Sequence, residues 1–382
     1  MAHIFKHPTP ESKGIVTFTH KELQFLIRWM GLPKLNAAKP MPAPKRFYKK
    51  LTRSRSVISQ VERIRKSYFI GIHWGFYFEN IRTPEWVDFH LASPGTCQFN
   101  DEQFIIPLSS ASFTPVVMRN NNQPKYWDII CVAKNDHKKK YPELMNQIRK
   151  IFDAGYPYKV LFIIASNKNE TENSNYTAIL DDYFAMFSAE EREYFTIIKT
   201  DPNLGFQGFS YTFLAHIYNQ SKVFTIFSQK EGVCKVIKEA QLCGLPVVVK
   251  NDMQGGGRDY LDERNSLTFE NYDTAYKALI EAVENYQDFV VDYDEIENAI
   301  GEQSSLKMLN TYFADLYARH GQTFDGELIN TDNLNRRLPA HYFDESITWA
   351  NAPEFRFKTT DVVTPQMLSD FVRELKTGGS GQ

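Results

Sequence analysis

The stretch Phe227–Val249, FSQKEGVCKVIKEAQLCGLPVVV, carries the strongest signal for the fold. It follows the apolar run KVFTIFS, continues through a segment with helical spacing, and reaches a run of valines after a Cys-Gly-Leu-Pro break. A strand, a helix and a second strand in this order form a parallel βαβ unit. The stretch also places one acid, Glu231, ahead of the expected helix and another, Glu239, inside it.

The same alternation runs through the preceding hundred residues. Apolar runs predict strands, and the segments between them predict helices, at 126–133 (strand), 141–154 (helix), 158–166 (strand), 194–200 (strand) and 210–219 (helix). Short β-branched runs that alternate with helices predict a parallel sheet covered on both faces. Such sheets bind ligands at the carboxyl ends of their strands.

The first hundred residues are less regular. They predict a strand at 14–20, a helix at 54–65 and a strong strand, SYFIGIHW, at 67–74, followed by two short apolar runs. The polar segment VVMRNNNQPK is the best boundary, so we expect a short N-terminal domain at 1–117 and a second domain at 118–340. A C-terminal helix within 340–377 is expected to pack on the first domain.

The composition narrows the functional classes. A chain of 382 residues is long enough for two domains, and its net charge of -2 gives no overall bias towards nucleic acid. The four cysteines lack zinc-ligand spacing, and no apolar run is long enough to span a membrane, so we expect a cytoplasmic protein with reduced thiols. The basic segment 39–55 is expected to be a surface linker; the alternative is peripheral contact with anionic lipid.

Three features after expected strands could carry chemistry. Lysines follow the strand at 126–133, and cations at this edge of a sheet suit a diphosphate, although a solvated charge run is the alternative.

The helix beginning near Val233 offers unpaired N–H groups to a phosphate. Glu239 lies about 12 Å along that helix from Glu231, so the two acids could meet opposite ends of an extended ligand. The alternative is an ordinary first-turn acid and a surface acid. Beyond the next strand, Gly255–Gly257 allow a backbone to approach a ligand closely.

The order of these elements resembles the donor-binding half of the family 4 (group 1) retaining glycosyltransferases, over roughly Phe104 to Glu284. IIPLSSASFTP is similar to the segment that ends in Phe-x-Pro before the interdomain link, and EGVCKVIKEAQLCGLPVVV to the E-x7-E signature. GGGRDYL is similar to the Gly-Gly-x-x-Glu element, with Asp259 in place of Glu. The resemblance implies the GT-B fold: two Rossmann-like domains with a deep cleft between them. The N-terminal domain departs from it, being unusually short and without a glycine-rich loop near its start.

The resemblance also implies site residues. Lys134, at the position of the usual Arg, and Lys140 would neutralise the donor diphosphate, and Glu231 would contact the transferred sugar. His73, at the end of the strand at 67–74, is the best candidate for the histidine that reaches the sugar, with His90 second. The donor-binding set would comprise Glu239 at the ribose, the phosphate cradle, the base-side residue and further loop residues: Gly232, Val233, Cys234, Lys235, Lys139, Thr200, Gly256 and Asp259.

The implied function is transfer of a sugar, with retention of anomeric configuration, from a nucleoside diphosphate sugar to a hydroxyl acceptor such as a glycan or glycolipid precursor. No cofactor or metal is required by this interpretation, and the DYD run at 292–294 is read as unrelated to metal binding. The alternatives are a sugar-nucleotide epimerase, a phosphorylase, or a non-catalytic subunit that binds nucleotide sugars. The sugar, the base, the acceptor and the oligomeric state stay open.

Overall fold

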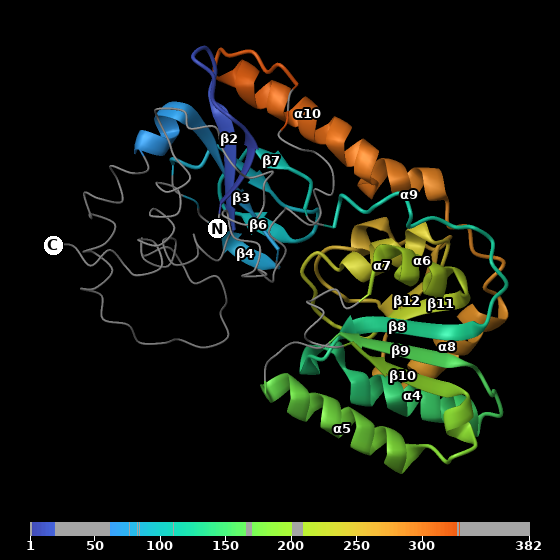
Figure 1. The fold of residues 1–382 in the computed structure, drawn as a ribbon. Helices are drawn as coiled ribbons and strands as arrows, with labels where there is room; N and C mark the ends of the chain where they lie inside the picture. The colour runs from blue at the N-terminus through green and yellow to red at the C-terminus, as the bar shows by residue number, and fades with distance from the viewer. Residues whose placement is uncertain are drawn as a thin grey trace, which may run out of the picture. The chain divides into compact units, whose positions relative to one another are not determined.

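The structure is a computed structural model, and it describes residues 2–19, 62–75, 77–81, 83, 85–109, 111–165, 170–200, 209–326 and 328. The chain forms two compact units (Figure 1). Unit 1 comprises Met1–Phe113 together with Gln303–Gln382, and unit 2 comprises Thr114–Glu302. The division lies close to the expected boundary after 117. The second unit ends at Glu302, whereas the expected second domain runs to 340.

Unit 2 is built on a six-stranded parallel sheet in the order β10-β9-β8-β11-β12-β13. Within β8, Ile129 is paired with Val160 of β9 on one side and with Val223 of β11 on the other. The strands are β8 (Trp127–Lys134), β9 (Val160–Ala165), β10 (Phe195–Lys199), β11 (Ser221–Ile226), β12 (Val247–Lys250) and β13 (Ser266–Phe269).

Helices cover both faces of this sheet. Figure 1 shows α4 and α5 on one side and α6 and α7 on the other, and contacts of α4 with α8 and of α7 with α9 complete the two layers. The helices are α4 (Tyr141–Asp153), α5 (Glu170–Met186), α6 (Tyr211–Asn219), α7 (Lys235–Leu242), α8 (Ala275–Glu284) and α9 (Tyr293–Ile300). Single 3₁₀ turns lie between them at η1 (His137–Lys139), η2 (Glu191–Glu193), η4 (Arg258–Tyr260) and η5 (Tyr272–Thr274). Because both faces are covered, strands such as β9 (VLFIIA) and β12 (VVVK) carry runs of apolar residues rather than an alternating pattern.

Unit 1 contains a five-stranded sheet in the order β1-β2-β3-β5-β7 and a small β4-β6 pair. Only the β1–β2 pairing is antiparallel among the strands of the described residues. The strands are β1 (Ala2–Lys6), β2 (Gly14–Thr19), β3 (Tyr68–His73), β4 (Phe78–Ile81), β5 (Phe89–Leu91), β6 (Cys97–Phe99) and β7 (Ile105–Ile106).

The helix α10 (Glu302–Arg319) belongs to unit 1. Its side chains Leu309, Phe313 and Leu316 share one core cluster with Phe69 and Phe89 of the sheet. Residues at these spacings lie on one stripe of a helix, so α10 covers the sheet face with a single apolar side. The N-terminal strands and a helix from far along the chain therefore make one hydrophobic core.

The α/β fold class predicted from the sequence is confirmed: the sheet of unit 2 is parallel, and that of unit 1 is parallel except for the β1–β2 pairing. The expected helix at 54–65 is described only in part, and residues 62–67 are helical. The basic segment 39–55 and the helix expected within 340–377 lie outside the described residues. In the part of the chain that the structure describes, every helix is too short or too polar to cross a bilayer.

Candidate functional site

The carboxyl ends of β8 and β11 form the centre of the candidate site. These strands are neighbours in the sheet, yet the chain runs outward from β8 through β9 to β10 on one side, and from β11 through β12 to β13 on the other. This is a topological switch point, where the connections after two adjacent strands diverge and leave a crevice for a ligand.

The connection after β8 presents the predicted lysines. Lys134 is the half-buried last residue of the strand. The Asp136 carboxylate then accepts a hydrogen bond from the backbone N–H of Lys138 at 3.0 Å and caps the η1 turn. Lys140 adopts a left-handed backbone conformation with φ 56°, and α4 begins at the next residue. This turn points neighbouring lysines in different directions.

Lys139 lies in the connection after β8, and its side chain forms an ion pair with Glu231, which lies in the connection after β11. The two side chains are only 15% and 10% exposed. Burial lowers the pKa of Lys139, but the Glu231 carboxylate outweighs it, so that the pKa lies above its ordinary value. Lys140 instead pairs with Glu143 of its own helix at 2.8 Å, where both side chains are about one-third exposed. The structure therefore places Lys139, and not Lys140, against the predicted sugar-binding acid.

The amino end of α7 borders this pair. Gly232 and Val233 lead to Cys234, which adopts a left-handed conformation with φ 35° immediately before the helix. Cys234 makes no side-chain cap, and the Ile237 N–H donates to the Cys234 carbonyl at 3.2 Å. The N–H groups before Ile237 have no partner within the helix itself. The positive end of the helix dipole adds to their attraction for an anion. Cys234 itself is 6% exposed, and burial raises the pKa of its thiol well above the ordinary value, which disfavours a reactive thiolate.

Glu239 is the fifth residue of α7, just over one turn from its start, and is only 4% exposed. Burial raises its pKa to about 7, against which the nearby Lys235 ammonium acts. Lys235 Nζ lies 3.9 Å from Glu239 Oε1 and 4.6 Å from the centre of the Tyr211 ring, and it also donates to the Tyr211 hydroxyl. The acid is thus held inside the protein, where Lys235 and Tyr218 both act to lower its pKa, and it is not the surface acid that was the alternative.

The glycine turn packs directly on the Glu231 loop. The Glu231 N–H donates to the Gln254 carbonyl at 2.9 Å, and the Gly256 N–H donates to the Gly232 carbonyl at 2.6 Å. Gly255 has φ 101°, and a Cβ there would lie 2.0 Å from the Glu231 carbonyl oxygen. Glycine is therefore required for the close approach of two backbones, and the turn holds Glu231 in place.

Lys238, which the sequence analysis missed, is completely buried on α7. Its Nζ lies 4.5 Å from the centre of the Tyr260 ring and 3.5 Å from the Tyr260 hydroxyl. Burial lowers the pKa of Lys238 to about 7, and the charge of Asp259 acts in the opposite direction. The charge of Asp259, in the segment after the glycine turn, thus raises the pKa of a lysine on α7. Periodicity could not single out Lys238, because every residue of α7 from Ile237 onward is buried.

The remaining candidates differ in their settings. Thr200 is buried, and its N–H donates to the Ile164 carbonyl at 3.0 Å. Residues 201–208, which follow it, lie outside the described residues, so the expected base-binding loop is not described. Asp292, the first acid of the DYD run, accepts from the N–H groups of Asp294 and Glu295 and caps α9. That run has a structural use as a helix start.

The two histidines of unit 1 lie at its sheet. His73 ends β3 and is 1% exposed. His90 accepts a hydrogen bond on Nδ1 from the Trp74 indole at 3.0 Å, so its Nε2 carries the proton and donates to Gln103 Oε1 at 3.1 Å. Burial lowers the pKa of His90 to about 4. With both nitrogens engaged in a neutral ring, His90 is a packed core histidine.

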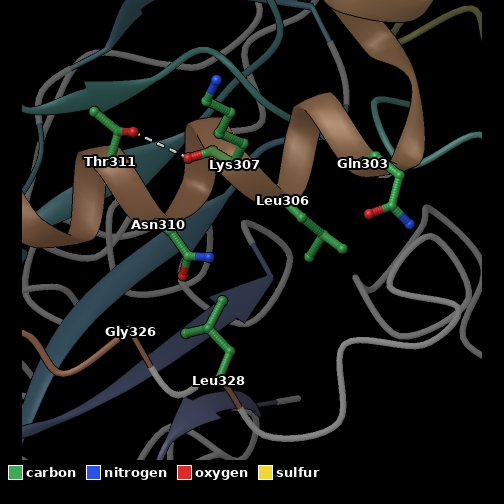
Figure 2. Close-up of a pocket in the computed structure, with 7 residues that line it drawn as sticks. All are labelled: Gln303, Leu306, Lys307, Asn310, Thr311, Gly326 and Leu328. Atoms are coloured by element: carbon green, nitrogen blue, oxygen red, sulfur yellow. Dashed lines mark hydrogen bonds between the residues drawn. The ribbon is translucent and has the colours of Figure 1, made fainter.

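Unit 1 also has an open groove of about 830 Å³ along α10. Figure 2 shows the side chains of this groove, which come from α10 and the segment after it: Gln303, Leu306, Lys307, Asn310, Thr311, Gly326 and Leu328. None of these residues is a predicted site residue, and the described lining holds a single cation, Lys307. A hollow of this kind has no set of groups for a diphosphate, so we place the candidate site at β8 and β11 instead.

Comparison with known proteins supports the same region. Residues 128–287 match the family described as Glycosyl transferases group 1, which confirms the resemblance for that part of the chain. No curated protein sequence matches the chain.

Several solved structures are similar at low identity. The GtfA/B complex is 14% identical, with 70% of this chain and 56% of that chain covered and a TM-score of 0.49. The pneumococcal O-GlcNAc transferase GtfA in complex with UDP and GlcNAc is 12% identical, with 67% and 53% covered and a TM-score of 0.46. Sucrose-phosphate synthase from Thermosynechococcus elongatus is 14% identical, with 75% and 82% covered and a TM-score of 0.46. The chain thus spans little more than half the length of the first two.

Proposed function

We propose that this protein transfers a sugar from a nucleoside diphosphate sugar to a hydroxyl acceptor with retention of anomeric configuration. The observation that carries the proposal is the Lys139–Glu231 pair beside the uncapped start of α7, at the switch point of a sheet within the matched region 128–287. This arrangement offers a cation and helix N–H groups to a diphosphate, and a carboxylate to the hydroxyls of the attached sugar.

Each group has a role in the proposed reaction. Lys134, Lys139 and the N–H groups of Val233, Cys234 and Lys235 stabilise the negative charge that develops on the leaving diphosphate. Charge stabilisation of this type is a large part of many enzymatic rate enhancements because the donors are fixed before the reaction. Glu231 orients the sugar, and Glu239 accepts hydrogen bonds from the ribose hydroxyls.

The residues proposed to bind the donor do not identify the acceptor. Within the proposal, unit 1 supplies the acceptor side, with His73 as its candidate contact to the sugar. The acceptor is a glycan or a lipid-linked precursor, and the basic segment 39–55 is proposed to bring the protein to an anionic membrane surface. Liposome sedimentation with and without anionic lipid tests that contact separately from catalysis.

A donor screen tests the proposal directly. UDP-, GDP-, ADP- and dTDP-sugars are added to the purified protein, and the donor that binds the native state raises the melting temperature. With that donor and a panel of hydroxyl acceptors, we expect release of nucleoside diphosphate and a product whose anomeric configuration matches the donor. A sugar product formed without an acceptor would indicate an epimerase, and binding without turnover would indicate a non-catalytic subunit.

Lys139 and Lys140 provide matched variants for the same assay. We expect Lys139→Ala to lower turnover by about a hundredfold or more, because it removes a buried cation from the developing charge. Lys140→Ala removes the neighbouring charge, which is paired with Glu143 near solvent, and should change turnover by no more than a few-fold. Wild-type turnover in Lys139→Ala would refute the phosphate assignment.

A further inference from the structure

Three lysines at this site have anionic partners. Lys235 lies beside Glu239, Lys140 beside Glu143, and Lys139 beside Glu231. The last pair differs from the other two, because Glu231 is not a neighbour on the same helix. It comes from the opposite side of the switch point and is itself the proposed contact for the sugar.

Local hydrogen bonds hold the backbone on both sides of the Lys139–Glu231 pair. Lys139 ends the η1 turn that Asp136 caps, and the Glu231 backbone is held by its hydrogen bond to Gln254. Both side chains are at least 85% buried, so the solvent screening that weakens exposed ion pairs is reduced here. A diphosphate that uses Lys139 must therefore displace a carboxylate that is already in place.

The geometry points to Glu231 as an internal competitor of the donor diphosphate for Lys139, and this makes the site favour a sugar nucleotide over the nucleoside diphosphate alone. The inference rests on the function proposed above. When a diphosphate takes Lys139, the Glu231 carboxylate is left in a largely buried position close to added negative charge. Burial of an unpaired charge is unfavourable, so this opposes binding of the bare diphosphate.

A sugar nucleotide removes this penalty. The hydroxyls of its sugar donate hydrogen bonds to Glu231 as the carboxylate leaves Lys139, and hydrogen bonds to charged groups are among the stronger ones in proteins. After transfer the sugar leaves with the acceptor, and Glu231 again lacks a partner. Re-formation of the Lys139 pair then favours release of the nucleoside diphosphate, which limits inhibition by product.

Binding measurements on four forms of the whole chain test the inference. Isothermal titration with UDP, GDP, ADP, dTDP and inorganic pyrophosphate is performed on the wild type, Glu231→Gln, Lys139→Met and the double variant. Glu263→Gln is the charge-matched control, because Glu263 is an exposed acid of unit 2 outside the site. Far-UV circular dichroism and a single unfolding transition verify each fold, and Glu231→Ala repeats the test should Glu231→Gln not fold.

We expect Glu231→Gln to bind the nucleoside diphosphate about tenfold more tightly than the wild type, while it binds the matching sugar nucleotide more weakly. Lys139→Met should bind both ligands more weakly, and the double variant should bind the diphosphate no more tightly than Lys139→Met. The control should follow the wild type.

The outcomes separate the inference from the proposed function. Equal or weaker diphosphate binding by Glu231→Gln, with normal binding by the wild type, overturns the inference and leaves the proposed function standing. A gain of the same size in Glu263→Gln overturns it as well, since net charge would then explain the effect. If no diphosphate or pyrophosphate binds any form, the proposed function fails, and the inference fails with it.

Discussion

At the scale of single residues, Glu239 makes stability depend on pH. Its pKa of about 7 in the folded protein lies above the ordinary value of 4.5, chiefly through burial. The folded state therefore holds the proton more tightly than the unfolded state does. The resulting stabilisation is complete below pH 4.5 and is lost as the pH rises through 7.

Glu239→Gln should remove this dependence because glutamine does not titrate. We expect the variant to gain roughly 1–3 kcal/mol of unfolding free energy over the wild type at about pH 8 and much less at about pH 5. Urea unfolding at a series of pH values measures the difference. The same pH-dependent gain in the exposed Glu263→Gln variant would show that the cause is net charge and not the buried carboxyl.

At the scale of elements, the glycine turn determines where Glu231 lies. A methyl group at Gly255 would lie 2.0 Å from the Glu231 carbonyl oxygen, and the backbone there has φ 101°. We expect Gly255→Ala to displace the Glu231 loop, to destabilise the protein by about 2 kcal/mol or more, and to weaken sugar-nucleotide binding.

Gly155→Ala is the matched control for Gly255→Ala. Gly155 also has a left-handed backbone, with φ 88°, but a methyl group there would have no atom within 4 Å apart from its chain neighbours. Gly155→Ala should lower the free energy of unfolding by about 1 kcal/mol, because alanine is strained in a left-handed backbone, and it should not affect ligand binding. If the two variants lose the same stability and both keep their ligand affinity, the close approach of the two loops is not needed for ligand binding.

The helix starts show how far the sequence could predict the site. The strand and helix order of unit 2 follows from apolar runs and breaks, and the placement of Glu231 ahead of a helix and Glu239 within it follows from the same pattern. The direction of a side chain in a turn does not. Lys139 and Lys140 are adjacent and chemically identical, yet Lys139 pairs with Glu231, whereas Lys140, whose backbone is left-handed, pairs with Glu143.

At the scale of the whole molecule, long-range packing was the part that the sequence could not predict. Spacing cannot tell which sheet a helix covers: residues up to 340 were expected in the second domain, whereas α10 belongs to unit 1. The N-terminal sheet needed a partner for its apolar face, and α10 supplies Leu309, Phe313, Leu316 and Tyr317 to it. Buried Lys238 is a similar case, because its partners Asp259 and Tyr260 come from a different element.

This packing predicts that the two units differ in their ability to fold alone. Unit 2 is one continuous stretch, 114–302, and its core is made from its own residues. Unit 1 is discontinuous, and a fragment 1–113 would expose the sheet face that α10 covers. Burial of each of four large α10 side chains contributes about 1.5–3 kcal/mol, which together is comparable with the roughly 5–15 kcal/mol stability of a whole domain.

We therefore expect fragment 114–302 to unfold cooperatively and to keep the rise in melting temperature that nucleoside diphosphate produces in the full chain. Fragment 1–113 should lack a cooperative transition until residues 303–382 are supplied in trans. Thermal unfolding followed by circular dichroism measures both, with Lys139→Ala in fragment 114–302 as the control for ligand specificity. A cooperative transition in 1–113 alone would contradict the assignment of α10 as an essential part of the unit 1 core. A fragment 114–302 that folds but gives no shift, beside a full chain that does, would place part of the diphosphate site outside unit 2.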